Sequence, residues 1–296
     1  MNPILNNQNN DENLKLLKAS AVAYTEAKAG ENRITYFLVL LAIIYPLSYL
    51  LIGDENIKLA LFGCSFLLTV IVLIFSENLK GKTSKGAILK EEFDIALFNL
   101  PWKSTLPKPD YAEVSKLSLK YKGDEIRDWY SPNLSESIPK NISIAVLQHT
   151  NTSWDIDLRI LFRSWLTGLV VSYTIALWII LIIINTDSKT IFSIFFSILS
   201  FYSHFINLIR GHSSTIKKRK VISEHLDQII RNRKNIKTSE LRDIQDEIYY
   251  TRLEPAKVPN FFFRLFKRRL NANAEDYIQL VNRIYSDNSF LPKFIP

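Results

Sequence analysis

The stretch "QHTNTSWD" at 148–155 contains two residues that could do acid–base chemistry, His149 and Asp155. Membrane-bound acyltransferases of the glycerolipid type leave four residues between such a pair, so that the carboxylate orients the imidazole as a general base. Here five residues separate them. On a helix the two side chains would be about 240° out of alignment. A helical conformation of this stretch therefore excludes the dyad.

The other sequence motifs that could indicate a ligand or metal site are incomplete. "GKTS" at 81–84 resembles the end of a phosphate-binding loop, but Ser76 stands where the first glycine should be and no strand precedes it. The one cysteine, Cys64, lies in an apolar run and offers neither a disulfide nor a thiolate metal site. We therefore expect no enzyme, no catalytic residue, no metal and no cofactor. A membrane-bound lipid-modifying enzyme is kept as the alternative.

Four long apolar runs determine the helices that position these residues. The 296-residue chain is 47% hydrophobic, and each run lacks charged residues and is long enough to cross about 30 Å of hydrocarbon as a helix. Short polar loops, "GDEN" and "NTDSK", join the runs in pairs. The sequence predicts an all-α membrane protein with four transmembrane helices in two hairpins and mainly helical cytosolic segments. The runs are 34–53, 59–76, 165–185 and 190–209.

Basic residues collect at the ends of the runs away from these loops, which places both termini and the middle segment in the cytoplasm. The polar first segment predicts no cleavable signal peptide. The predicted organisation is a cytosolic N-terminal helix at 1–33, a transmembrane hairpin at 34–76, a cytosolic middle domain at 77–163, a second transmembrane hairpin at 164–209 and a basic cytosolic C-terminal helical segment at 210–296.

The cytosolic segments have helical patterns. Residues 11–33 lead straight into the first span, and 142–165 contain neither proline nor glycine and so continue into the third span. An apolar stripe from Ile88 to Leu100 ends at Pro101. Further helices are predicted at 111–122 and near 214–234, 239–253 and 274–286.

The predicted fourth span carries polar residues on one helical face. Such a face either packs against another helix, since serines allow close approach, or lines a water-filled path. The sequence leaves both readings open. The candidate pore-lining residues are Ser193, Ser197, Ser200, His204 and Asn207.

The C-terminal segment carries the whole positive excess of the chain. From Arg210 onward there are 18 basic and 10 acidic residues, while the chain as a whole has a net charge of +8. Within it, "VPNFFFRLFKRRL" at 258–270 combines phenylalanines with basic residues. This pattern is typical of a helix at a membrane interface, and packing on the cytosolic domain is the alternative.

Taken together, several motifs resemble those of the SMODS-associated four-transmembrane effectors, the S-4TM family. The resemblance covers nearly the whole chain in order. The motifs are "ENLKLLKASAVAYTEAK" (12–28), "KEEFDIALFNLPWK" (90–103), "KPDYAEVSKLSLKYK" (108–122), "WYSP" (129–132), "QHTNTSWD" (148–155) and "IQDEIYY…VPNFFFRLFKRR" (244–269).

This resemblance implies a membrane effector of a bacterial cyclic-nucleotide anti-phage system of the CBASS type, which forms or gates a pore that breaches the inner membrane and aborts infection. It implies a cyclic oligonucleotide or dinucleotide as regulatory ligand, the lipid bilayer as partner and no direct nucleic-acid binding. "QHTNTSWD" then matches a family motif that does not require histidine, which makes it an architectural or sensing element. A pore shared between copies predicts a homo-oligomer, with a tetramer as a guess.

A cyclic nucleotide offers bases to stack on and phosphates to neutralise, so its site needs aromatic and basic side chains together. Glu91, Glu92 and Asp94 are expected instead to pair with basic residues of the same domain. A non-conducting receptor that recruits a partner remains a further alternative. The candidate ligand-binding residues are Trp102, Arg127, Trp129, Tyr130, Trp154 and Arg159.

Overall fold

The computed structural model describes residues 2–254 and 256–286, without the side chains of residues 72, 73 and 75–80. Within these residues every regular element is a helix, as predicted. A short 3-10 helix, η1 (Pro3–Leu5), precedes the α-helices. These are α1 (Asp11–Leu51), α2 (Glu55–Phe98), α3 (Tyr111–Ser118), α4 (Lys140–Ile183), α5 (Ser188–Ser197), α6 (Leu199–Arg231), α7 (Thr238–Arg252) and α8 (Asn260–Ser286).

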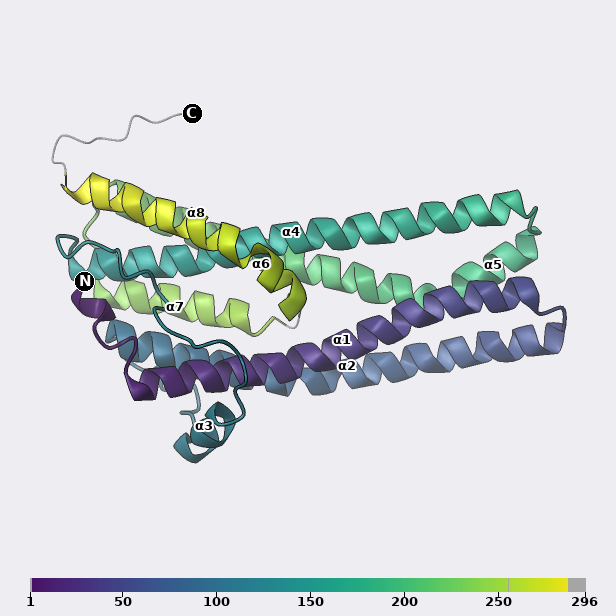
Figure 1. Ribbon diagram of the computed structural model, residues 1–296, viewed down its shortest axis with the longest axis horizontal. Coiled ribbons are helices and arrows are strands. Elements are labelled where there is room, and N and C mark those ends of the chain that lie inside the picture. Colours follow the sequence, from purple (N-terminus) through teal and green to yellow (C-terminus); the bar gives the residue numbers. More distant parts are fainter. Residues whose placement is uncertain (1, 255, 287–296) are drawn as a thin grey trace.

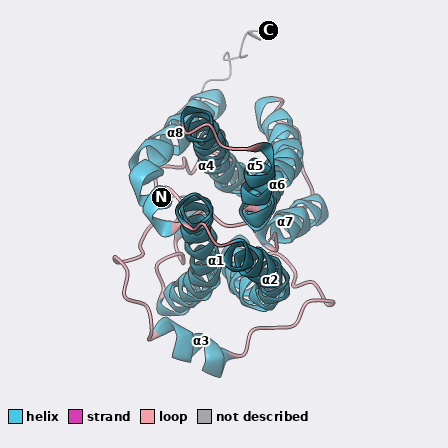
Figure 2. Cartoon of the chain, turned by 90° about the vertical axis from the view of Figure 1, so that its right-hand side faces the viewer, coloured by secondary structure: helices cyan, strands magenta, loops and turns pink. Residues whose placement is uncertain are grey.

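Two long hairpins run side by side along the molecule (Figure 1). In the first, α1 packs along α2, and in the second, α4 packs along α6. Both tight connections lie at the same end, and the carboxylates of Asp54 and Asp187 cap the helices that follow by accepting the backbone N–H groups of Asn56 and Thr190. Seen along their length, the hairpins form two separate pairs, with α3 outside the first (Figure 2).

Buried apolar side chains form two clusters that divide the molecule along its length. One fills the half that contains α3 and α7 and includes Leu17, Phe93, Leu147 and Ile248. The other lies between the hairpins and includes Tyr45, Phe162, Leu181, Phe201 and Phe262. The long helices contribute to both, so each connects the two halves.

Toward the hairpin loops, large apolar side chains point outward, for example Leu51 at 82% and Ile183 at 76% exposure. Within the part of the chain that the structure describes, α1 and α4 are each long and apolar enough to cross a membrane, and α5 with α6 is a third candidate as a bent pair. The predicted second span lies in α2, partly outside the described side chains. The number of four spans therefore stays a prediction.

The fourth apolar run departs from the sequence prediction. The single helix expected over 190–209 is wrong, because α5 and α6 meet at Ile198 with a bend of 50°. The Ser197 hydroxyl donates to the Ser193 carbonyl at 2.8 Å. A side-chain bond of this kind to the preceding turn favours helix bending, which gives a physical reason for the break.

The helices predicted outside the apolar runs are largely confirmed. Residues 11–33 continue into the first span within α1, and 142–165 continue into the third within α4. The helix near 239–253 is α7. Two boundaries differ, because 214–234 forms the end of α6 rather than a separate helix, and α8 joins most of the 258–270 segment to 274–286.

Candidate functional site

His149 and Asp155 lie on α4 but take different partners. The buried His149 ring stacks on Tyr277 with 4.2 Å between centroids, and burial lowers the His149 pKa to about 4. Asp155 instead pairs with Arg159 at 2.5 Å and with Arg219 at 3.2 Å. The stretch is helical, so the argument from spacing is confirmed and the two residues form no dyad.

Trp129 and Tyr130 lie beside Lys90, away from Arg127. The Lys90 ammonium lies 3.7 Å from the centroid of a half-exposed Trp129 ring. The buried Tyr130 hydroxyl donates to Asp94 at 2.9 Å. Arg127 is exposed and bonds to Glu125 at 2.6 Å. The structure thus brings two of these candidates together around a lysine that the sequence did not single out.

The other ligand candidates lie apart from one another. Trp102 packs against the apolar cluster that includes Phe93 and Leu147, and its ring N–H donates to the Leu106 carbonyl at 3.0 Å. Trp154 donates to Asn271 of α8 at 3.0 Å. Arg159, one turn further along α4, is buried.

The pore-lining candidates differ in exposure. Ser197 and Ser200 are buried, and the Ser197 hydroxyl lies 3.3 Å from that of Tyr49 on α1. His204 is half-buried and its Nε2 lies 2.9 Å from the Thr35 hydroxyl, also on α1. Ser193 is half-buried and Asn207 is exposed. Part of this face therefore packs against α1, and part remains accessible.

The phenylalanine-rich segment at the start of α8 has one buried face and one exposed face. Phe262 is buried against Phe162, with 5.0 Å between ring centroids. Phe261 and Leu265 are exposed, as is Arg268. One face of α8 thus anchors it to the bundle, while the other presents apolar and basic side chains.

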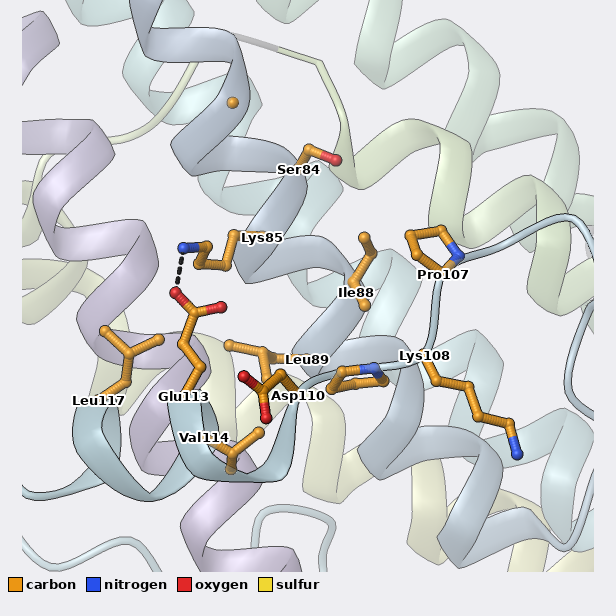
Figure 3. A pocket seen from close by; sticks show the side chains of 12 residues that line it. Ser84, Lys85, Ile88, Leu89, Pro107, Lys108, Asp110, Glu113, Val114 and Leu117 are labelled. Atoms are coloured by element: carbon orange, nitrogen blue, oxygen red, sulfur yellow. Dashed lines mark hydrogen bonds and ion pairs between the residues drawn. The ribbon is translucent and has the colours of Figure 1, made fainter.

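A shallow surface pocket of about 340 Å³ lies between α2, α3 and the preceding loop (Figure 3). Lys85 pairs with Glu113 across it, and Asp110 caps α3 by accepting the Ala112 N–H at 2.9 Å. Lys108 also lines it, so its charges are balanced. Among the residues that the structure describes, no aromatic side chain lines it, so these residues offer no surface on which a base could stack.

A buried ion network joins α2 to α7. Arg242 bonds to Glu91 at 2.8 Å, and Arg252 reaches Glu91 at 3.3 Å and Asp94 at 2.5 Å. The prediction that Glu91 and Asp94 pair within the domain is confirmed, whereas Glu92 accepts a bond from Tyr111. We call this the Glu91 cluster, comprising Lys90, Glu91, Asp94, Arg242, Asp246 and Arg252.

Every charged side chain of the Glu91 cluster pairs with an opposite charge. Three buried cations face three carboxylates, Lys103 adds a partly exposed ion pair with Asp246 at 2.8 Å, and Gln245 bonds to Glu91 at 2.8 Å. Although burial alone raises it, Lys90 and Arg252 hold the pKa of Asp94 below its usual range. Such a closed network fixes α7 against α2.

A second buried ion network lies where the two hairpins meet. Asp155 and Arg159 come from α4, Arg219 from α6, Lys28 and Glu31 from α1, and Lys257 from the segment before α8. These six residues are the Asp155 cluster. Burial alone would raise the pKa of Asp155, but Arg159 and Arg219 hold it well below its usual range.

The segment before α8 closes this cluster. The Arg159 guanidinium donates to the Ala256 carbonyl at 2.9 Å, and the Lys257 ammonium donates to the Arg252 carbonyl at 2.9 Å. A Cβ on Gly211 of α6 would lie 2.9 Å from that of Ala256, so glycine permits this close approach.

Sequence reasoning found Asp155 and Arg159 but missed the other members of the Asp155 cluster. Arg219 belongs to "KKRK" at 217–220, a pattern typical of the basic residues that flank a membrane span. The available signal was helical spacing, because Arg219 lies four residues from Thr215 and seven from His212, both buried, and so shares their face.

Comparison with known proteins supplies the context. The model of the SMODS-associating 4TM effector domain family matches residues 2–280. A relative described as a probable CBASS effector molecule, from Bacillus cereus strain VD146, is 28% identical over 301 residues, covering 95% of this chain and 98% of its own. No solved structure matches the chain.

Proposed function

Because the chain belongs to the SMODS-associating 4TM effector family, we propose that it responds to a cyclic nucleotide by breaching the bacterial inner membrane, and that its four spans place both termini in the cytoplasm. The family and the relative support the coarser role of a CBASS-associated effector. The breach is a pore shared by several copies.

The observation that carries this proposal is the continuity of the long helices. The same α4 holds Asp155 and Arg159 at one end and the apolar stretch up to Ile183 at the other. Likewise α1 runs from Lys28 and Glu31 to Leu51. A rigid helix transmits a displacement along its length, so a ligand that shifts the cytosolic half also shifts the membrane half.

The bend between α5 and α6 at Ile198 is a second part of the proposed mechanism. A hydrogen bond between the hydroxyls of Ser197 and Tyr49 holds this bend against α1. Asn207 and part of His204 stay accessible on the other side of the bend. A change in the angle between α5 and α6 would move this polar face toward a shared axis in an oligomer.

Leakage from liposomes tests the function directly. Purified protein in vesicles of phosphatidylethanolamine and phosphatidylglycerol, loaded with a self-quenched dye, is exposed to a panel of cyclic di- and trinucleotides. One of them should release the dye, and light scattering should show an oligomer in mild detergent. Binding of a nucleotide without any leakage would instead identify a non-conducting receptor.

Two variants separate pore lining from packing. If this face lines the path, Ser200→Leu should lower leakage with normal abundance. If the face is a packed interface, the variant should lose about 1–3 kcal/mol of folding free energy, and its abundance should fall as well. Ser172→Leu is the matched control, because Ser172 is exposed on α4 within the apolar half. Unchanged leakage in well-expressed Ser200→Leu would remove this face from the pore.

A further inference from the structure

The Asp155 cluster has an excess of buried positive charge. Its cations are Lys28, Arg159, Arg219 and Lys257, and its acids are Glu31 and Asp155. Both guanidinium groups approach the same oxygen, Oδ2 of Asp155. Leaving a buried charge without a counterion is costly, so the cluster would be stabilised by an anion.

Arg219 is the cation whose bonding is least complete. Its side chain is only 4% exposed, and its Nη1 is buried without a hydrogen-bond partner among the described residues. Its Nε has only the ion pair with Asp155 at 3.2 Å. By contrast, Arg159 bonds to Asp155, to His212 and to the Ala256 carbonyl. Buried guanidinium donors normally have partners, and Arg219 therefore has donors available for a ligand.

The cluster is open to solvent at one edge. The Asp155 side chain keeps 23% of its surface exposed, whereas those of Arg159 and Arg219 keep 6% and 4%. Lys28 and Glu31 on α1 are also half-buried rather than fully enclosed. A small anionic group at this edge would meet Lys28 first, and it would reach the buried Arg219 donors through a change in side-chain conformation.

We propose that the Asp155 cluster binds a phosphodiester group, with Arg219 as its principal donor and with Lys28 and Lys257 completing the positive field. A planar guanidinium offers two parallel N–H groups to a phosphate. The Asp155 carboxylate, already neutralised by Arg159, positions Arg219 from the opposite side.

The location gives the site a role in the movement of the hairpins. Lys28 belongs to the first hairpin, and Arg159 and Arg219 belong to the second. Lys28 also bonds to Asn260 at the start of α8 at 2.9 Å. A phosphodiester that contacts Lys28 and Arg219 together would join the two hairpins at the level where they leave the cytosolic core.

Two sources could supply this chemistry, a cyclic oligonucleotide and the headgroup of an anionic phospholipid. Binding of a phosphodiester does not depend on the proposed function, whereas a nucleotide source rests on it. The test uses the full chain purified in phospholipid-free detergent. The probes are a panel of cyclic di- and trinucleotides, dioctanoyl-phosphatidylglycerol and dimethyl phosphate, each titrated by calorimetry and by thermal unfolding.

The expected result is that at least one probe binds and that Arg219→Gln weakens it about tenfold or more, as for loss of a charged hydrogen bond. Lys220→Gln is the control, because it removes the same charge from an exposed neighbour on α6 and should bind like the wild type. Nucleotide binding without lipid binding identifies the signal, and the reverse identifies a lipid site.

Equal affinity of folded Arg219→Gln and wild type for every probe would overturn the inference, as would binding of none. Leakage measured in parallel keeps the two proposals separable. Nucleotide-triggered leakage that survives Arg219→Gln contradicts a nucleotide at this site and leaves the function standing. Binding that needs Arg219 without any leakage supports the site and contradicts the function.

Discussion

The Glu91 and Asp155 clusters are both buried ion networks, but they are built differently. In the Glu91 cluster each guanidinium bonds to two carboxylates, Arg242 to Glu91 and Asp246 and Arg252 to Glu91 and Asp94. In the Asp155 cluster two guanidinium groups share one carboxylate oxygen. Both keep buried donors without a hydrogen-bond partner among the described residues, on Lys90 and Arg242 in the first and on Arg219 in the second. Only in the second do four cations face no more than two carboxylates.

The two clusters also differ in which helices they connect. The Glu91 cluster joins α2 to α7, two helices of one packed core. The Asp155 cluster joins α1, α4 and α6, which belong to different hairpins. A network of paired charges within one core favours rigidity. A network with excess positive charge between two hairpins is suited to respond to an anion. We therefore assign a structural role to the Glu91 cluster and a regulatory role to the Asp155 cluster.

The largest expected effect comes from removing one arginine from each cluster. Arg252→Met should lower the free energy of unfolding by about 3–5 kcal/mol, because Glu91 and Asp94 lose a buried partner. Arg219→Met should change it by less than about 1 kcal/mol in anion-free buffer, since Arg159 still neutralises Asp155. Thermal unfolding in detergent measures both. Equal losses would contradict the distinction between the clusters.

A smaller effect is expected from pH. Burial lowers the pKa of Lys257 to about 7 and raises that of Glu31 to about 7. As pH falls from 8 to 6, Lys257 gains a positive charge and Glu31 loses a negative one, so both changes make the Asp155 cluster more positive. Affinity for a phosphodiester, whose own charge is constant in this range, should rise up to about tenfold.

Two variants locate this pH dependence. Lys257→Met should reduce it, because Glu31 and Lys28, whose pKa burial lowers to about 8, still titrate in this range. Burial also lowers the pKa of Lys90 to about 7, so Lys90→Met is the control from the Glu91 cluster and should leave the dependence intact. Calorimetric titrations at pH 6, 7 and 8 measure it. An affinity that is constant or falls toward pH 6 would exclude these groups from the site.

The smallest expected effect concerns the edge of the Glu91 cluster. Trp129→Leu removes the ring that faces Lys90 at 3.7 Å and should lower the free energy of unfolding by about 1 kcal/mol. Phosphodiester affinity should not change, because Trp129 contacts the balanced cluster. A clear loss of nucleotide binding with normal stability would instead make Trp129 a surface on which a base stacks, as the sequence suggested.

Most of the helices and their order could be predicted from the sequence, although the break at Ile198 could not. Charge-free runs and helical spacing are local properties, so α1 and α4 were expected as continuous helices and α7 lies near its predicted range. The spacing of His149 and Asp155 was enough to exclude a dyad on a helix. The pairing of Glu91 and Asp94 with basic residues was also expected, since buried acids need partners.

Which charges meet depends on tertiary packing. Lys28, Arg219 and Lys257 come from distant parts of the chain, and nothing in the sequence links them to Asp155. Only the packing of the two hairpins places them together and buries Arg219 next to a carboxylate that it shares. Local spacing specifies a helix face, but the neighbours of that face, and hence its unbalanced charge, depend on contacts between segments far apart in the sequence.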